Sequence, residues 1–186
     1  MRYFRKIGSL GKFMWQVNHM FAHMLIGFLF AWFLREIWES LPRGYIFLSV
    51  AASVLPDLDH FIFAFTYGRH EWYAKEVRRL LKEGQIRTLT LFFKNNHKYN
   101  SGLATHNVYF IGGFFLLAFM SFQFDSKTGV VIFGAMVLHL LFDIVDDMLM
   151  LGYINDNWKH LKRKKPDEGE FKLAPEVTST QPLRKR

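Results

Sequence analysis

Long apolar runs and charged stretches alternate along this chain of 186 residues. Four of the runs approach the roughly 20 residues that a helix needs to cross the hydrocarbon core of a bilayer. The runs are Phe13–Leu34, Tyr45–Phe65, Leu103–Phe124 and Gly129–Leu151. Turn-forming residues separate the first two runs at Pro42 and Gly44, and the last two at Asp125 and Ser126. The pattern therefore predicts an all-α fold, a bundle of four transmembrane helices.

The middle of the chain, residues 69–98, has a different pattern. Apolar residues recur there at helical spacing among arginines and lysines: Trp72, Val77, Leu80 and Leu81. This pattern is typical of an amphipathic helix at a membrane interface. We therefore expect a helical loop on the cytoplasmic side, with its apolar side facing lipid.

The C-terminal stretch has no periodic apolar side. From Trp158 onward the chain is polar, charged and contains proline, which is the composition of a disordered segment. The expected organisation is a membrane-embedded helical domain at residues 1–157, followed by a disordered basic tail at 158–186.

Composition supports a core that faces lipid. Hydrophobic residues make up 51% of the chain, with 21 Phe, and the mean hydropathy of +0.04 averages very apolar runs with a polar tail. A soluble all-α protein with buried helices is the alternative. It explains the apolar runs, but it explains neither their length nor their alternation with charge.

The positions of the basic residues predict a topology. The formal net charge is +8, and Lys and Arg gather in the N-terminal arm, in residues 69–98 and in the tail. The positive-inside rule places these three segments on one side, so we expect a multi-pass protein of the inner or plasma membrane with both termini in the cytoplasm. The basic tail then faces anionic lipid, either as a plain electrostatic anchor or as a site that recruits a partner.

The apolar runs contain many ionisable residues: His19, His23, Asp57, Asp59, His60, His106, His139, Asp143, Asp146 and Asp147. Such groups cost several kcal/mol at membrane depth and usually mark function. His19 and His23 are four residues apart, so they share one face of a helix. The same spacing relates His139 to Asp143.

A proline in the motif LPDLDH adds to this pattern. In an ideal helix, Asp57 and Asp59 would point in nearly opposite directions. Pro56 removes one helix hydrogen bond, so a break there could turn both carboxylates toward one site. At about 1.5 Å per residue, most of the ionisable side chains also reach one depth in the cytoplasmic half of the bundle. We therefore expect one shared site, with Asp146 and Asp147 at its margin.

The residue types restrict the chemistry of this site. The chain has no Cys, so a metal must bind through His, Asp, Glu or backbone oxygen. Nitrogen and carboxylate ligands suit divalent zinc before manganese or iron, and the number of candidates suggests one to three ions. Such centres activate water and hold the oxygens of a phosphoester.

The ordered set of motifs resembles a known family. A His in the first run, LPDLDH in the second, Thr-His at the start of the third and His-x3-Asp in the fourth are similar to the YdjM-type inner-membrane metal-dependent hydrolases, a family distantly similar to zinc-dependent phospholipase C and P1-type nucleases. The resemblance covers about residues 19–150. It implies that Asp57, Asp59 and His106 act in catalysis. It also implies a metal site made of His23, Asp57, Asp59, His60, His106, His139 and Asp143.

One position departs from the family pattern. Ser101 stands where the family has a histidine, five residues before His106. His97 could replace that histidine, or it could be an ordinary surface residue, and His19 is a further candidate ligand. The departure leaves the number of metal ions open.

Two functions of different classes fit the sequence. The first is a membrane-embedded hydrolase of a phosphoester, with a lipid-borne substrate favoured by the depth of the site; nucleic acid is a further candidate because basic loops attract polyanions. The second is a non-catalytic metal-binding membrane protein, either an ion carrier or a scaffold for a cytoplasmic partner. No G-x-S-x-G signature of a serine hydrolase is present.

Overall fold

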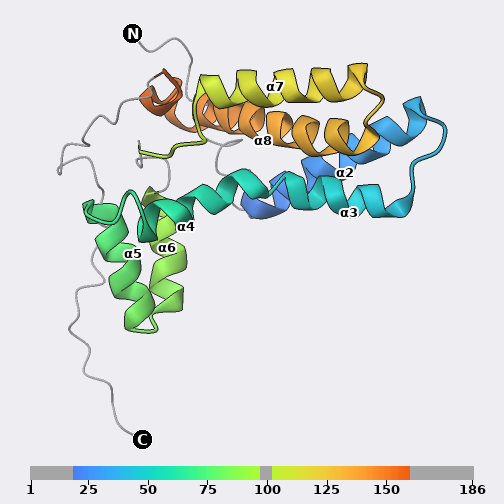
Figure 1. Cartoon of the computed structure of the whole chain (residues 1–186). Helices are drawn as coiled ribbons and strands as arrows, with labels where there is room; N and C mark the ends of the chain where they lie inside the picture. The colour runs from blue at the N-terminus through green and yellow to red at the C-terminus, as the bar shows by residue number, and fades with distance from the viewer. Residues whose placement is uncertain (1–18, 97–101, 160–186) are drawn as a thin grey trace, which may run out of the picture.

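The computed structural model describes residues 19–96 and 102–159, and every regular element in these two ranges is helical (Figure 1). The elements are α2 (His19–Ile37), α3 (Arg43–Ala52), η1 (Leu55–Asp57), α4 (Leu58–Phe65), α5 (Trp72–Lys82), α6 (Ile86–Asn96), α7 (Val108–Gln123), α8 (Lys127–Leu151) and η3 (Asp156–Lys159). The all-α prediction is confirmed. The expected tail lies outside the described residues, except for Trp158 and Lys159.

Three segments are long and apolar enough to cross a membrane: His19–Ile37, Arg43–Phe65 and Lys127–Leu149. At most 33% of the most apolar window in each is buried inside the protein. Large apolar side chains therefore face outward, among them Phe33 and Phe47, which are 59% and 76% exposed. An apolar surface of this extent fits lipid better than water. The fourth expected span corresponds to α7, a shorter apolar helix of 16 residues.

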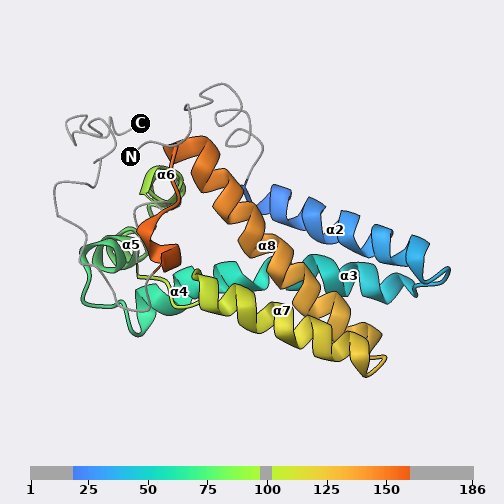
Figure 2. The same ribbon diagram turned by 90° about the horizontal axis from the view of Figure 1, so that it is seen from above.

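The long helices lie side by side and alternate in direction (Figures 1 and 2). α7 packs along α8, α2 packs along α3, and α8 also contacts both α2 and α3. Because the directions alternate, α2 and α7 begin at the same end of the bundle at which α4 and α8 finish. The expected ligands come from these helix ends, so the topology brings them together.

A glycine allows α2 and α3 to approach closely. The Oγ atom of Ser49 donates a hydrogen bond to the backbone carbonyl of Gly27 over 2.7 Å. A Cβ atom on Gly27 would lie 2.5 Å from Oγ of Ser53 and 2.7 Å from the backbone oxygen of Ser49. Only glycine therefore fits at this crossing without a shift of the backbone.

The helix that carries LPDLDH breaks where the sequence predicted. α3 ends at Ala52, a turn and the short 3-10 element η1 follow, and α4 begins at Leu58. Pro56 lies within η1 and has no N–H to continue the α-helical hydrogen bonds. The break re-aims the residues that follow, and it exposes the backbone carbonyl of Ser53 to a partner on α8.

α7 begins five residues later than the apolar run suggested. Residues 103–107 form an irregular segment, and the side chain of Asn107 accepts hydrogen bonds from the backbone N–H groups of Tyr109 and Phe110. This is an N-cap, and it ends the irregular segment. His106 therefore lies on a loop that is held at the end of the bundle.

α5 and α6 form a helical hairpin at the same end of the bundle (Figure 1). The amphipathic helix predicted in this region is present as α5, but the expectation that its apolar side faces lipid is wrong. Val77 and Leu80 are almost fully buried and pack with Phe63 of α4 and Phe92 of α6. The apolar side of α5 is therefore covered by protein.

The exposed side of α5 carries ion pairs. Arg79 donates to Glu76 and Glu83, and this hydrogen bonding lowers the pKa of the Glu76 carboxyl. Because these groups are exposed, the pairs contribute little to stability.

Candidate metal centre

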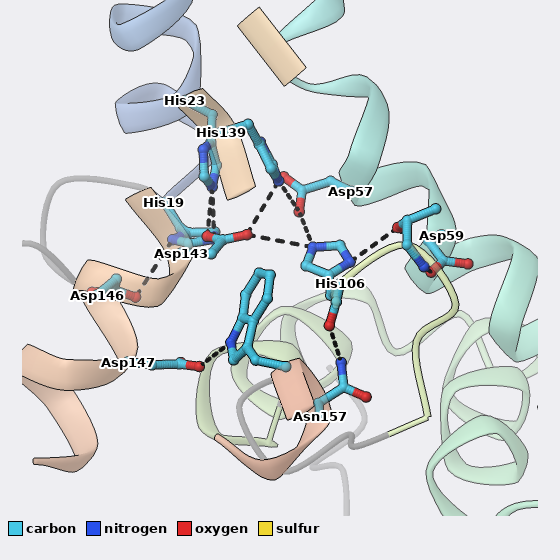
Figure 3. A network of polar contacts seen from close by, with 12 residues as sticks. His19, His23, Asp57, Asp59, His106, His139, Asp143, Asp146, Asp147 and Asn157 are labelled. Atoms are coloured by element: carbon cyan, nitrogen blue, oxygen red, sulfur yellow. Dashed lines mark hydrogen bonds and ion pairs between the residues drawn. The ribbon is translucent and has the colours of Figure 1, made fainter. Parts of the chain in front are cut away.

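The ionisable residues meet at the end of the bundle where α2 and α7 begin (Figure 3). α2 supplies His19 and His23 from its first two turns, and α8 supplies His139 and Asp143 from one face. Asp57 comes from the break in the second long helix, and His106 comes from the loop before α7. The sequence predicted this convergence from depth along the helices.

Asp143 lies at the centre of the cluster and faces a pair of histidines with each oxygen. Its Oδ1 atom is 3.2 Å from Nε2 of His23 and 3.4 Å from Nε2 of His19. Its Oδ2 atom is 3.2 Å from Nε2 of His139 and 3.4 Å from Nε2 of His106. The carboxylate therefore links two groups of imidazoles.

Asp57 is the second carboxylate that both groups share. Its Oδ1 atom lies 3.7 Å from Nε2 of His139 and 4.0 Å from Nε2 of His106. One candidate ligand group contains His19, His23, Asp57 and Asp143, and the other contains Asp57, His106, His139 and Asp143. Within each group, the ligand atoms all lie within 4.8 Å of one another.

The separations between these atoms fit a metal ion. Ligand atoms about 2.1 Å from a tetrahedral zinc ion are about 3.4 Å apart. The shortest distances from Asp143 to His23 and to His139 are both 3.2 Å. Nitrogen and oxygen ligands without sulfur suit divalent zinc, manganese or iron. The residues present therefore fit a divalent metal centre.

Ring orientation gives independent support for a metal at this place. Nδ1 of His139 lies 2.6 Å from the backbone oxygen of Ser53. A carbonyl oxygen only accepts, so Nδ1 carries a proton, and in the neutral ring Nε2 then keeps its lone pair. This is the arrangement of a metal-binding histidine, whose second nitrogen is held by a carbonyl or a carboxylate.

Several buried atoms of the cluster lack a hydrogen bond within the described part of the chain. Among them are Nε2 of His106, Nε2 of His139 and Oδ1 of Asp143. The two nitrogens lie close to Asp143, but they are not aligned with it as hydrogen bonds. Buried polar atoms without partners cost about 1–3 kcal/mol each. A cation held with His106 and His139 would satisfy the two nitrogens, and one held with His19 and His23 would satisfy Oδ1 of Asp143.

His19 joins the cluster, a question that the sequence left open. Its Nε2 atom is 2.9 Å from Nε2 of His23, and its Nδ1 atom is 4.0 Å from Oδ2 of Asp146. Asp146 and Asp147 are both buried beside the cluster, at its margin as expected.

Asp59 and His60 lie close to the cluster without entering either ligand group of the described residues. The carboxylate of Asp59 accepts hydrogen bonds from Tyr67 and Thr105, so the break at Pro56 does not bring both carboxylates of the motif to one point. The ring of His60 lies 5.4 Å from that of His106 and lines the neighbouring cavity. His97 and Ser101 lie outside the described residues.

A small cavity of about 40 Å³ opens beside the cluster. A water needs about 10–15 Å³ of such space, so a few waters or a small polar group would fit. The lining residues are His19, Asp57, His60, Leu103, His106, Asp143, Asp147, Asn155, Asn157 and Trp158. Four of the candidate ligands, His19, Asp57, His106 and Asp143, thus face this cavity.

The segment after α8 covers this cavity, and sequence reasoning missed it. Gly152 adopts a left-handed conformation with φ 78°, which ends α8 and turns the chain back over the cluster. We call residues 152–159 the C-terminal strap. Nε1 of Trp158 donates to Asp147 over 2.7 Å, and Nδ2 of Asn157 donates to the backbone oxygen of His106 over 2.8 Å. Trp158 therefore packs with the bundle, one residue beyond the expected domain end.

Comparisons of the chain with protein-family models, with curated proteins and with solved structures find no match. The geometry of the site is therefore the basis for inferring function.

Proposed function

We propose that this chain is a membrane-embedded, metal-dependent hydrolase of phosphoesters, similar to the YdjM-type family. One observation carries the proposal. The two oxygens of Asp143 face different histidine pairs, so Asp143 would hold one divalent ion together with each pair. Zinc is the first candidate for these ions, with manganese and iron as alternatives.

A pair of divalent ions supplies Lewis acidity to phosphoryl oxygens and lowers the pKa of a coordinated water. The chain's own residues hold this chemistry in place. His19 and His23 face one side of Asp143, and His106 and His139 face the other. His60 lines the cavity outside both ligand groups and is placed to hydrogen-bond an oxygen of the substrate.

In the reaction that we propose, the oxygen of a water forms a bond to phosphorus as the ester P–O bond breaks. One proton of that water is released, and the leaving oxygen is protonated to give an alcohol. The products are a phosphate monoester or phosphate and the alcohol, so the step needs no other reactant. The cavity admits a phosphoryl group and little more, which favours a small charged group on an extended substrate.

A lipid-borne phosphoester fits the place of the site. The cluster lies at one end of helices whose outer faces are apolar, near exposed side chains such as Phe21, Leu58 and Val108. In our proposal, four helices cross the membrane with both termini in the cytoplasm. The cavity then lies at the level where headgroups meet acyl chains.

The structure offers less support for an ion carrier. A carrier needs polar groups along its whole path through the membrane. Among the described residues, no buried ionisable residue lies between 24 and 56 or between 108 and 138. The opposite half of the bundle is packed by Ala31, Leu34 and Val131 instead.

Hydrolysis by the purified protein in lipid nanodiscs tests the proposal. Zinc-loaded wild-type protein should release phosphate or a phosphate monoester from a phospholipid in the disc, or p-nitrophenol from bis(p-nitrophenyl) phosphate. Asp143→Asn should be inactive, while Asp125→Asn, in the turn between α7 and α8, should keep wild-type activity. A wild-type protein that holds its metal and cleaves no phosphoester of either kind would contradict the proposal.

A further inference from the structure

Asp59 is bonded on both of its oxygens. The hydroxyl of Tyr67 donates to Oδ1 over 2.5 Å. The backbone N–H and the hydroxyl of Thr105 donate to Oδ2 over 2.8 and 3.0 Å. The oxygen of Tyr67 in turn accepts from the backbone N–H of Ala104 over 2.9 Å. An ionised carboxylate only accepts, so the direction of each of these bonds is fixed.

These bonds decide which nitrogen of His106 carries the proton. The hydroxyl proton of Thr105 is donated to Asp59, so its oxygen has only lone pairs to offer Nδ1 of His106, 3.1 Å away. Nδ1 must therefore be the donor. A neutral imidazole has one N–H, so the lone pair stays on Nε2. Nε2 is the atom that lies 3.4 Å from Oδ2 of Asp143.

The opposite tautomer of His106, with the proton on Nε2, is less favourable on physical grounds. If the hydroxyl of Thr105 donated to Nδ1 of His106, Asp59 would lose one of its hydrogen bonds. A charged carboxylate is a stronger acceptor than a neutral ring nitrogen, so the proton of Thr105 belongs with Asp59. His139 reaches the same state by a different route, since the carbonyl of Ser53 accepts from its Nδ1.

We propose that Asp59 and Tyr67 are positioning residues for the metal centre. Acting through Thr105, they hold His106 as the Nδ1–H tautomer with Nε2 directed at the ligand cluster. The described residues that line the cavity do not include Asp59, Tyr67 or Thr105. The inference rests on the proposed function, because a metal ion is what makes the lone pair on Nε2 useful. In this proposal Asp59, the second carboxylate of LPDLDH, orients the candidate ligand His106.

The first measurement reads the tautomer directly. Histidine is labelled with ¹⁵N in metal-free protein at about pH 8, above the ordinary His pKa of about 6.5. The His106 signals are identified by their loss in His106→Gln. We expect Nδ1–H in the wild type, and an Nε2–H population in Asp59→Asn and Thr105→Val. Thr105→Ser keeps the hydroxyl and should restore the wild-type signal, which a loss of packing alone would not do.

The second measurement is zinc affinity, by competition with a chromophoric chelator. Loss of an outer hydrogen-bond partner typically weakens metal binding 10–100-fold. We expect a loss of that size for Asp59→Asn and Thr105→Val, and about 10-fold for Tyr67→Phe. Thr105→Ser should bind like the wild type. Tyr45→Phe and Thr128→Val are matched controls, because they remove the hydrogen bond between Tyr45 and Thr128 at the other end of the bundle.

Two results would overturn the inference. One is an Nε2–H signal from His106 in the wild type. The other is Asp59→Asn protein with wild-type tautomer and wild-type zinc affinity. Neither measurement needs turnover, so protein that binds zinc without hydrolysing a phosphoester would refute the proposed reaction alone. Protein that binds no zinc would refute the proposed function, while the tautomer would still decide the role of Asp59.

Discussion

Asp57 and Asp59 approach opposite nitrogen atoms of one imidazole ring. Oδ1 of Asp57 lies 4.0 Å from Nε2 of His106 (Figure 3). Asp59 reaches Nδ1 of the same ring through the hydroxyl of Thr105. The two carboxylates are separated by one residue, so helical geometry already directs them apart, and the break at Pro56 does not bring them together. One is placed as a ligand and the other as a support for a ligand.

Asparagine at these two positions should have different effects on metal binding. Asp57→Asn removes a charged oxygen that both ligand groups share, so we expect fewer ions per chain even at saturating zinc. Asp59→Asn should weaken the affinity and leave the number of ions at saturation unchanged. Zinc titration followed by elemental analysis separates the two outcomes. An equal loss of bound ions in both variants would show that Asp59 is itself a ligand.

The strap should stabilise the site through Trp158. Trp158→Phe keeps an aromatic ring but removes the hydrogen bond to the buried carboxylate of Asp147, at a cost of about 1.5–3 kcal/mol. We expect a lower apparent Tm and faster release of zinc to a chelator. The matched control is Trp32→Phe, because Trp32 is half-exposed on the outer face of α2. Equal effects of the two changes would contradict a role for the strap.

Close packing of α2 on α3 should be necessary for the metal centre. Gly27→Ala places a Cβ atom against the backbone oxygen of Ser49, and overpacking of this kind costs about 1–3 kcal/mol. The shift moves α2, which carries His23, and α3, whose end holds His139 through Ser53. We therefore expect lower stability and weaker zinc binding. Gly112→Ala is the control, because its Cβ meets no atom within 4 Å. Thermal unfolding and zinc titration of both variants check the prediction.

The proposed topology is tested by cysteine labelling, since the chain has no Cys of its own. A reagent that cannot cross the membrane should modify Ser126→Cys in intact cells. It should reach Lys82→Cys, in the α5–α6 hairpin, only after the membrane is opened. Both positions are exposed, so a difference between them reports the side of the membrane. The reverse pattern would contradict the topology and the placement of the site at the cytoplasmic end.

Much of the fold and of the cluster follows from local sequence rules. Helical spacing places His19 with His23 and His139 with Asp143, and a proline must interrupt a helix. Depth along four antiparallel helices then predicts that these residues form one cluster. The start of α7 was placed too early because the run from Leu103 is apolar. The cap made by Asn107 decides that boundary instead.

Other features depend on contacts that no spacing reveals. The apolar side of α5 could face lipid or protein, and only the packing of Val77 and Leu80 on α4 and α6 decides between them. Asp59 was grouped with Asp57 because both follow Pro56. Its partner Thr105 is 46 residues away in the chain, and no local rule predicts that hydrogen bond. The sequence predicts a tail at Trp158 because a single aromatic residue makes no periodic pattern.

The metal content of the purified chain tests the central claim most directly. Elemental analysis should find two divalent transition-metal ions per wild-type chain after zinc is added and the excess removed, one for each ligand group around Asp143. Asp143→Asn should lose both ions, because its oxygens face both groups, while Asp125→Asn should keep both. Folded wild-type protein that retains no stoichiometric metal, or Asp143→Asn protein that retains two ions, would contradict the account.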